Sequence, residues 1–152
     1  MRSAPVSLRS KAIGLLARRE YARSELEQRL LAKGASRHEL NLLLDELIAE
    51  GYLSDARYAR AVAAQKHGGY SRRRITDELK SRGIARVDID AALAATEIDD
   101  ATALRALWQR RFGRVPADER EKARQVRFLQ GRGFALSAVL KLMRETAETR
   151  GG

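Results

Sequence analysis

YSRRRITDELKSRGIARVDIDAAL (residues 70–93) contains two amphipathic segments separated by a glycine. Its apolar side chains recur at helix-compatible intervals on both sides of that glycine. They are Ile75, Leu79, Ile84, Val87, Ile89 and Leu93. Glycine suits the position just past a helix end, where a left-handed backbone costs other residues roughly 1 kcal/mol. The stretch therefore predicts two helices joined by a turn at Gly83.

The same pattern occurs three times along the chain. Gly34, Gly83 and Gly133 are 49 and 50 residues apart, and a basic residue precedes each of them. Apolar residues stand four positions before each glycine and six and ten positions after it. These are Leu30, Leu79 and Leu129, then Leu40, Ile89 and Val139, then Leu44, Leu93 and Met143. An internal repeat of about fifty residues is typical of stacked helical modules.

Capping signals place the helices within each repeat. The spacing predicts capping boxes at Ser24–Glu27 and Ser36–Glu39. The residues predicted as N-caps of later helices are Asp55, Ser71 and the pair Asp99–Asp100. Pro116 is predicted as the first residue of a further helix, and residues 134–145 as the last helix. Nine helices in three groups follow from these signals.

We therefore predict an all-α fold of three tandem three-helix repeats in an elongated, curved row. The expected repeats are residues 10–53, 54–98 and 99–146, with flexible tails at 1–9 and 147–152. A three-helix module of this size has a small core, so neighbouring modules should share an interface. Tyr21 and Tyr70 both lie thirteen residues before a turn glycine, and we expect them to brace helix packing rather than bind a ligand.

The charge of the chain favours a polyanion or an acidic protein surface as partner. Thirty basic and twenty acidic side chains give a formal net charge of +10. Residues 101–152 hold twelve basic against five acidic side chains, so they supply seven of the ten net charges. Residues 65–86 hold seven basic and two acidic side chains, whereas residues 87–100 hold five acidic and none basic. A single charge cluster can also be merely a solvated face, but segregation on this scale favours an interaction surface.

Composition gives no support to catalysis, a metal site or a cofactor. The chain has no cysteine, and its two histidines, His38 and His67, lack the neighbours that a metal site or a nucleophilic relay requires. We expect no catalytic, cofactor-binding or metal-binding residues and no enzyme activity. No apolar run approaches the roughly 18 residues of a membrane span, so no membrane contact and a cytoplasmic location are predicted.

A helix-turn-helix repressor is a competing interpretation of the helix-glycine-helix pattern. The start of its second helix enters the major groove and should be neutral or basic. Here that segment contains Asp88 and Asp90 in the second repeat and Glu39 in the first. Carboxylates at this position oppose binding to phosphates, so sequence-specific DNA recognition is disfavoured.

Three segments resemble the RecX family of bacterial regulatory proteins. They are EGYLSDARYARAVA (residues 50–63), GYSRRRITDELKSRGI (69–84) and KARQVRFLQGRGFALSAVLKLM (122–143). The resemblance implies three tandem three-helix repeats and, as partner, the RecA recombinase assembled on single-stranded DNA. It also implies binding in the helical groove of that filament, and mostly inhibition of filament extension, ATP hydrolysis and strand exchange. We expect a monomer, with direct binding to single- or double-stranded DNA as a further property.

The alternative function is a general nucleic-acid-binding helical protein with no recombinase preference. Both functions need a basic face, and the resemblance carries over no catalytic or ligand residue. The candidate contact residues therefore rest on charge and position alone. They are Arg72, Arg73, Arg74, Lys80 and Arg82 in the second repeat, and Arg110, Arg111, Arg114, Lys122, Arg124, Arg127 and Arg132 in the third.

Overall fold

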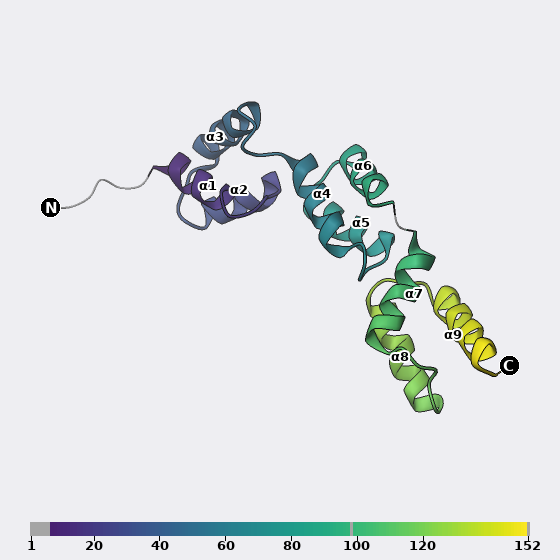
Figure 1. The fold of residues 1–152 in the computed structure, drawn as a ribbon. Coiled ribbons are helices and arrows are strands. Elements are labelled where there is room, and N and C mark those ends of the chain that lie inside the picture. The colour runs from purple at the N-terminus through teal and green to yellow at the C-terminus, as the bar shows by residue number, and fades with distance from the viewer. Residues whose placement is uncertain (1–6, 98, 152) are drawn as a thin grey trace. The chain divides into compact units, whose positions relative to one another are not determined.

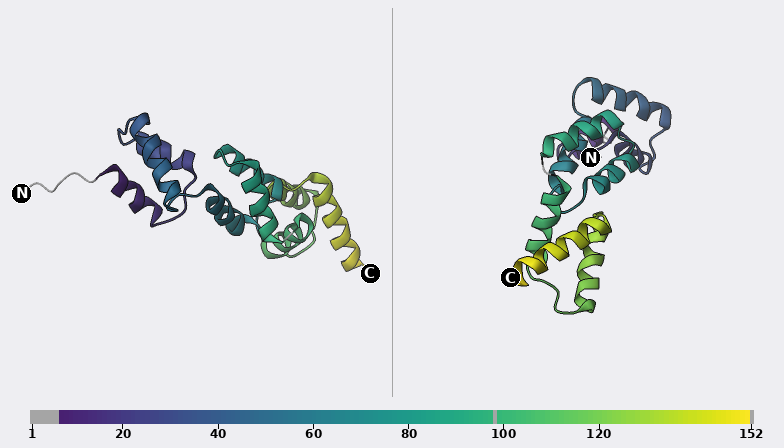
Figure 2. Two further views of the ribbon diagram at one scale, coloured as in Figure 1. Left: turned by 90° about the horizontal axis from the view of Figure 1, so that it is seen from above. Right: turned by 90° about the vertical axis from the view of Figure 1, so that its right-hand side faces the viewer.

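The computed structural model describes residues 7–97 and 99–151, and all regular secondary structure in that part of the chain is helical (Figure 1; Figure 2). The helices are α1 (Leu8–Leu16), α2 (Arg23–Leu31), α3 (Arg37–Ala49), α4 (Asp55–Lys66), α5 (Arg72–Ser81), α6 (Arg86–Thr96), α7 (Asp100–Arg111), α8 (Glu119–Gly131) and α9 (Leu136–Gly151). The predicted all-α fold is confirmed. Within the described residues, no helix has both the length and the apolar character needed to span a membrane.

The described chain divides into two compact units. The first comprises residues 7–61 and 79–92, and the second comprises residues 62–78, 93–97 and 99–151. In the first unit, α2 packs against α3 and α1 around a core rich in leucine, including Leu26, Leu30 and Leu44. In the second unit, α9 packs against α8 and α7 around Trp108, Leu129 and other apolar side chains. The core residues that recur in the repeat pattern are thus buried as the spacing predicts.

Several predicted helix caps are present. The Ser36 hydroxyl accepts a hydrogen bond from the Glu39 backbone N–H (3.3 Å) at the start of α3. The Ser71 hydroxyl accepts one from the Arg74 N–H (3.0 Å) before α5, and Asp99 accepts one from the Thr102 N–H (2.7 Å) before α7. Each bond satisfies a backbone donor that has no partner within its own helix.

Three predicted helix starts are wrong. Helix α2 begins after Ala22, whose N–H donates to the Glu25 carboxylate (3.2 Å), so Ser24 and Glu27 do not form the capping box. Helix α4 is capped by the Ser54 hydroxyl, which accepts from the Arg57 N–H (3.2 Å), and not by Asp55. Helix α8 begins after Asp118 and not at Pro116. At α4 and α8 the polar side chain of the residue just before the helix forms the cap, whereas the cap residue of α2 is an alanine.

The helix ends predicted from the glycines agree with the structure better than the helix starts predicted from the capping signals. Gly34, Gly83 and Gly133 have φ values of +92°, +77° and +96°, as the left-handed turn requires. The outer limits differ from the prediction, because α1 begins at Leu8 and α9 continues to Gly151. Residues 1–6 and 152 of the predicted tails lie outside the described part of the chain.

The third repeat has a buried glutamine, hydrogen-bonded to a tryptophan, at a position where the other two repeats have an apolar residue. Gln125 aligns, by distance from the turn glycine, with Leu26 and Ile75. Its side-chain oxygen accepts a hydrogen bond from the Trp108 indole N–H (2.9 Å), and its amide donates to the Arg114 carbonyl (3.3 Å). Gln125 and Trp108 are both buried. The pair therefore fixes α7, α8 and the connection between them by polar contacts as well as by packing.

The cap of α7 makes a prediction about pH. Hydrogen bonds from the backbone and side chain of Thr102 lower the pKa of Asp99 from its ordinary value of 3.8. Because the folded-state pKa is depressed, the stabilisation is present above the unfolded-state pKa and is lost as the pH falls through the folded-state pKa. We expect Asp99→Asn, which can still accept the cap hydrogen bond, to lose stability less steeply than wild type below pH 4. Urea midpoints at pH 7 and pH 3 test this, and parallel losses in the two proteins would contradict it.

Candidate polyanion interface

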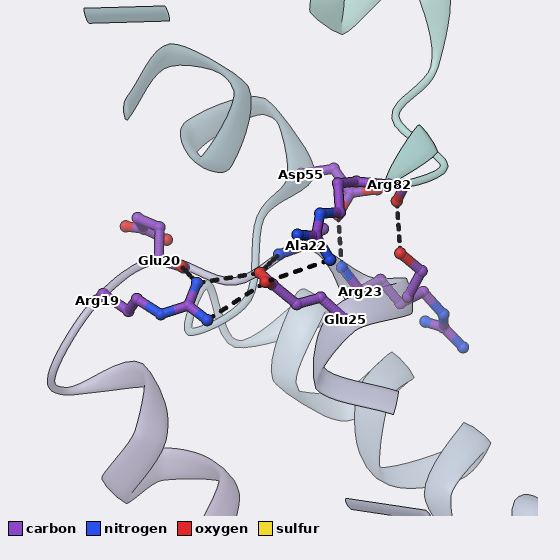
Figure 3. Close-up of polar contacts among 8 residues, drawn as sticks. Arg19, Glu20, Ala22, Arg23, Glu25, Asp55 and Arg82 are labelled. Carbon is purple, nitrogen blue, oxygen red and sulfur yellow. Dashed lines mark hydrogen bonds and ion pairs between the residues drawn. The ribbon is translucent and has the colours of Figure 1, made fainter. Parts of the chain in front are cut away.

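The turn before Gly83 contacts the start of α2, within the first unit. The Ser24 hydroxyl donates to the Arg82 carbonyl (2.5 Å), and the Arg82 guanidinium lies 3.9 Å from the Glu25 carboxylate. Arg19 also donates to Glu25, at 3.1 and 3.3 Å, and this hydrogen bond raises the pKa of Arg19. Figure 3 shows Glu25 with its bonds to Arg19 and Ala22, and Arg82 nearby. At this contact the Glu25 carboxylate pairs with the guanidinium groups of both Arg19 and Arg82.

The turn before Gly133 similarly contacts the start of α5, within the second unit, but through a backbone donor. The Ser71 backbone N–H donates to the Arg132 carbonyl (3.0 Å). Here, however, the position nine residues before the turn glycine is Arg74 and not the glutamate found at position 25. The Arg74 guanidinium donates to the Gly131 carbonyl (2.7 Å), so two arginines lie at a contact where the first unit pairs arginine with glutamate.

Further cations meet at the loop of residues 67–70. Arg132 donates to the Gly69 carbonyl (3.4 Å), and Arg110, from the last turn of α7, donates to the Gly68 carbonyl (3.0 Å). The guanidinium carbons of Arg132 and Arg74 lie 4.6 and 5.7 Å from the centre of the Tyr70 ring. We call the side chains of Tyr70, Arg74, Arg110 and Arg132 the Tyr70 cluster.

In the described part of the chain, the arginines of the Tyr70 cluster bond to backbone carbonyls and form no ion pairs. Among the described residues, none of the three has an acidic oxygen within the 4.0 Å of an ion pair. Their hydrogen-bond partners are backbone carbonyls, and Lys66, whose ammonium lies 5.1 Å from the Tyr70 ring centre, already pairs with Glu78 (2.6 Å). The cluster therefore concentrates positive charge that no ion pair among the described residues offsets.

Aromatic rings extend the cluster toward α8. Arg132 also lies over the Phe128 ring (5.0 Å), and Arg111 lies over the same ring (4.9 Å). Phe112 packs against Phe128 edge to face, with ring centres 5.5 Å apart. Stacking on an aromatic face holds a guanidinium in place while its N–H edge can still bind an oxygen.

The structure thus brings together four candidate residues that the sequence placed in two separate groups. Arg74 comes from the second repeat, and Arg110, Arg111 and Arg132 come from the third. The sequence predicts that Tyr70 braces helix packing. In the structure its ring contacts Lys66, Arg74 and Arg132, and the association with these two candidate arginines is not part of the sequence prediction. The only signal available was that Tyr70 and Arg132 both occupy fixed positions relative to a turn glycine.

The other candidate residues of the second repeat each have different surroundings. Arg72 is used internally, because its N–H donates to Asp100 (2.9 Å) and its guanidinium to the Leu93 carbonyl (3.2 Å). Arg73 is exposed beside a shallow groove of about 380 Å³ that Leu136 also lines. Lys80 is exposed at the end of α5, and Arg82 makes the contact with Glu25 described above.

Helix α8 presents a second basic surface. Arg120, Arg124 and Arg127 are all exposed and recur at the i, i+4 and i+7 positions, so they share one helical face. Arg124 has a distant ion pair with Glu121 (4.0 Å). The sequence prediction omitted Arg120, although this spacing could have identified it. Lys122 lies on a different face, in a pocket with Met143 and Arg144, and Arg114 is exposed in the preceding loop.

Chemically, this arrangement suits the binding of anions. The described residues contain no group of three acidic, histidine or cysteine side chains placed to hold a metal ion. Guanidinium groups held on aromatic rings or backbone carbonyls can form paired hydrogen bonds to phosphate or carboxylate oxygens. The second unit is therefore a helical module that carries several exposed arginine side chains.

Comparisons with known proteins place this helical module in a family. The model described as "RecX, second three-helix domain" matches residues 54–93, and "RecX, third three-helix domain" matches residues 97–143. The chain belongs to the RecX family.

Similar proteins include "Regulatory protein RecX" of Ectopseudomonas mendocina, 46% identical over 92% of this chain and 95% of that protein. The protein of the same name from Ralstonia pickettii is 37% identical over 91% and 87% of the two chains. The crystal structure of RecX from Lactobacillus salivarius matches the fold with a TM-score of 0.64 at 17% identity, over 92% of this chain and 94% of that one. The relatives are thus named as regulatory proteins.

Proposed function

We propose that this protein binds the RecA filament on single-stranded DNA, in its helical groove, and inhibits filament extension, ATP hydrolysis and strand exchange. Membership of the RecX family supports a regulatory role. The observation that carries the proposal is the positive charge of the second unit, along α8 and at the Tyr70 cluster, whose arginines form no ion pair among the described residues. A nucleoprotein filament is a polyanion, so such a surface attracts it over long range.

The steady-state ATPase activity of RecA on single-stranded DNA tests this function. We expect the protein, added at well below one molecule per RecA monomer, to suppress ATP hydrolysis. The reason is that blocking growth at a filament end or within its groove affects many RecA subunits for each regulator bound. Titrations at fixed RecA and fixed DNA measure the ratio at which inhibition is half complete.

The alternative, a general nucleic-acid-binding protein, gives a different result in the same assay. Such a protein would compete with RecA for DNA and would need enough molecules to coat the strand. Adding excess single-stranded DNA at fixed RecA separates the two functions. Inhibition that disappears with excess DNA, and that follows occupancy of bare DNA, would contradict filament regulation.

A further inference from the structure

The geometry points to the Tyr70 cluster as a binding site for consecutive phosphodiester groups of a single-stranded nucleic acid. This inference deepens the proposed function and rests on it only for the choice of a nucleic-acid partner. The site consists of the Arg74, Arg110 and Arg132 guanidinium groups, with Tyr70 as the ring that supports two of them.

The two turn contacts of this chain provide an internal comparison. In the first unit, Glu25 lies between Arg19 and Arg82 and neutralises part of their charge. In the second unit, the equivalent position holds Arg74, beside Arg132. Like charges at one contact repel each other, and an anion that binds between them removes that repulsion. At the second contact a positive side chain therefore stands where the first contact has a negative one. An external anion can take the place of this missing carboxylate.

The guanidinium groups are held in position before any anion binds. Arg74, Arg110 and Arg132 each donate one hydrogen bond to a backbone carbonyl, at 2.7, 3.0 and 3.4 Å. A guanidinium has five N–H donors, so each group keeps donors for a phosphate oxygen. Because the side chains are already ordered, binding costs less conformational entropy than it would for extended, mobile arginines.

The aromatic rings of this region favour contacts with the backbone of the nucleic acid over contacts with its bases. Single-strand binders commonly stack bases on exposed rings. Here Arg74 and Arg132 lie over the Tyr70 ring, and Arg111 and Arg132 lie over the Phe128 ring. These guanidinium groups compete with a base for the faces of both rings, so we expect binding to depend little on base sequence.

A nucleic-acid backbone also fits the cluster better than an acidic protein surface does. The three guanidinium groups come from α5, α7 and the turn after α8, and meet around one short loop. A strand carries a charge on every residue, so it can meet several such groups in succession without a specially matched pattern of carboxylates. Arginine also binds phosphate oxygens in pairs through its planar fork.

The test measures binding of a fluorescent oligo(dT) of about 20 nucleotides to the full chain, without recombinase, over a series of salt concentrations. We expect Arg74→Glu to weaken binding about tenfold at 0.1 M salt, because it removes one phosphate contact and adds a repulsive charge. Arg74→Met should flatten the slope of log affinity against log salt by about 0.7, the value for one single-strand phosphate contact. Oligo(dA) of equal length should bind like oligo(dT).

Arg60→Glu is the matched control, since Arg60 is exposed on α4 and the substitution changes the net charge equally. It should leave affinity within about twofold of wild type, as surface charges away from a contact have small effects. Thermal unfolding checks that each variant folds. We expect Arg74→Glu to fold, because a glutamate there can pair with Arg132 as Glu25 pairs with Arg82.

Three results would overturn the site. One is an equal loss of affinity in Arg74→Glu and Arg60→Glu, which would mean that net charge alone matters. Another is failure of wild type to bind the oligonucleotide. The third is equally tight binding of a poly-glutamate peptide of the same charge, which would identify an acidic protein as the partner.

RecA ATPase assays report separately on the proposed function. If Arg74→Glu loses DNA binding but wild type does not inhibit RecA, the site stands and the proposed function falls.

Discussion

Gly133→Ala should destabilise the protein by about 3 kcal/mol or more, the combined cost of a strained backbone and an overpacked contact. Gly133 has a φ of +96°, where an alanine is strained whatever the space around it. In addition, its new methyl group would overlap the Ser71 hydroxyl oxygen and lie 2.6 Å from the Arg74 Cβ atom. Ser71 is buried and caps α5, so it cannot move away without losing that cap.

The other turn glycines provide controls of equal chemistry. Gly34 has nearly the same φ, +92°, but nothing lies within 4 Å of an added methyl group. Gly34→Ala should therefore show only the backbone strain, about 1–2 kcal/mol. At Gly83 the nearest atom is the Ser24 side chain at 3.8 Å, an ordinary contact, so Gly83→Ala should resemble Gly34→Ala. Urea denaturation of the three variants measures the difference, and three equal losses would show that the contact at Gly133 relaxes freely.

Breaking the buried Trp108–Gln125 hydrogen bond should cost about 2 kcal/mol, because one buried polar group is then left without a partner. We expect this loss in Gln125→Leu, which strands the indole N–H, and in Trp108→Phe, which strands the glutamine oxygen. The double variant should be more stable than the sum of the two losses predicts, because it removes both polar groups. Leucine also suits the position, since the equivalent residue of the first repeat is Leu26.

The control for this pair is Gln130→Leu, an exposed glutamine on the same helix. A surface change of this kind is expected to alter stability by less than about 0.5 kcal/mol. Thermal or urea unfolding of the four variants, followed by circular dichroism, gives the coupling free energy. Additive losses would indicate that the hydrogen bond contributes nothing beyond packing.

Local sequence signals predicted the kind of structure better than its boundaries. The apolar repeat around Gly34, Gly83 and Gly133 gave the helical fold, since a 3.6-residue period and a left-handed glycine are properties of neighbouring residues alone. Caps at Ser36, Ser71 and Asp99 were found for the same reason. At α4 and α8, two or more polar residues compete for the cap and the pattern alone does not rank them, whereas the cap residue of α2 is Ala22, which no polar signal marks.

The sequence by itself also determined the excess of basic residues and their concentration in the last third of the chain. Only the tertiary structure decided which of them form a site. Arg74 and Arg132 are 58 positions apart in the sequence, and they meet because the turn before Gly133 contacts the start of α5. Arg72, two residues from Arg74, is turned to internal partners instead. Charge is a property of single residues, whereas its compensation depends on which side chains packing brings within a few ångströms.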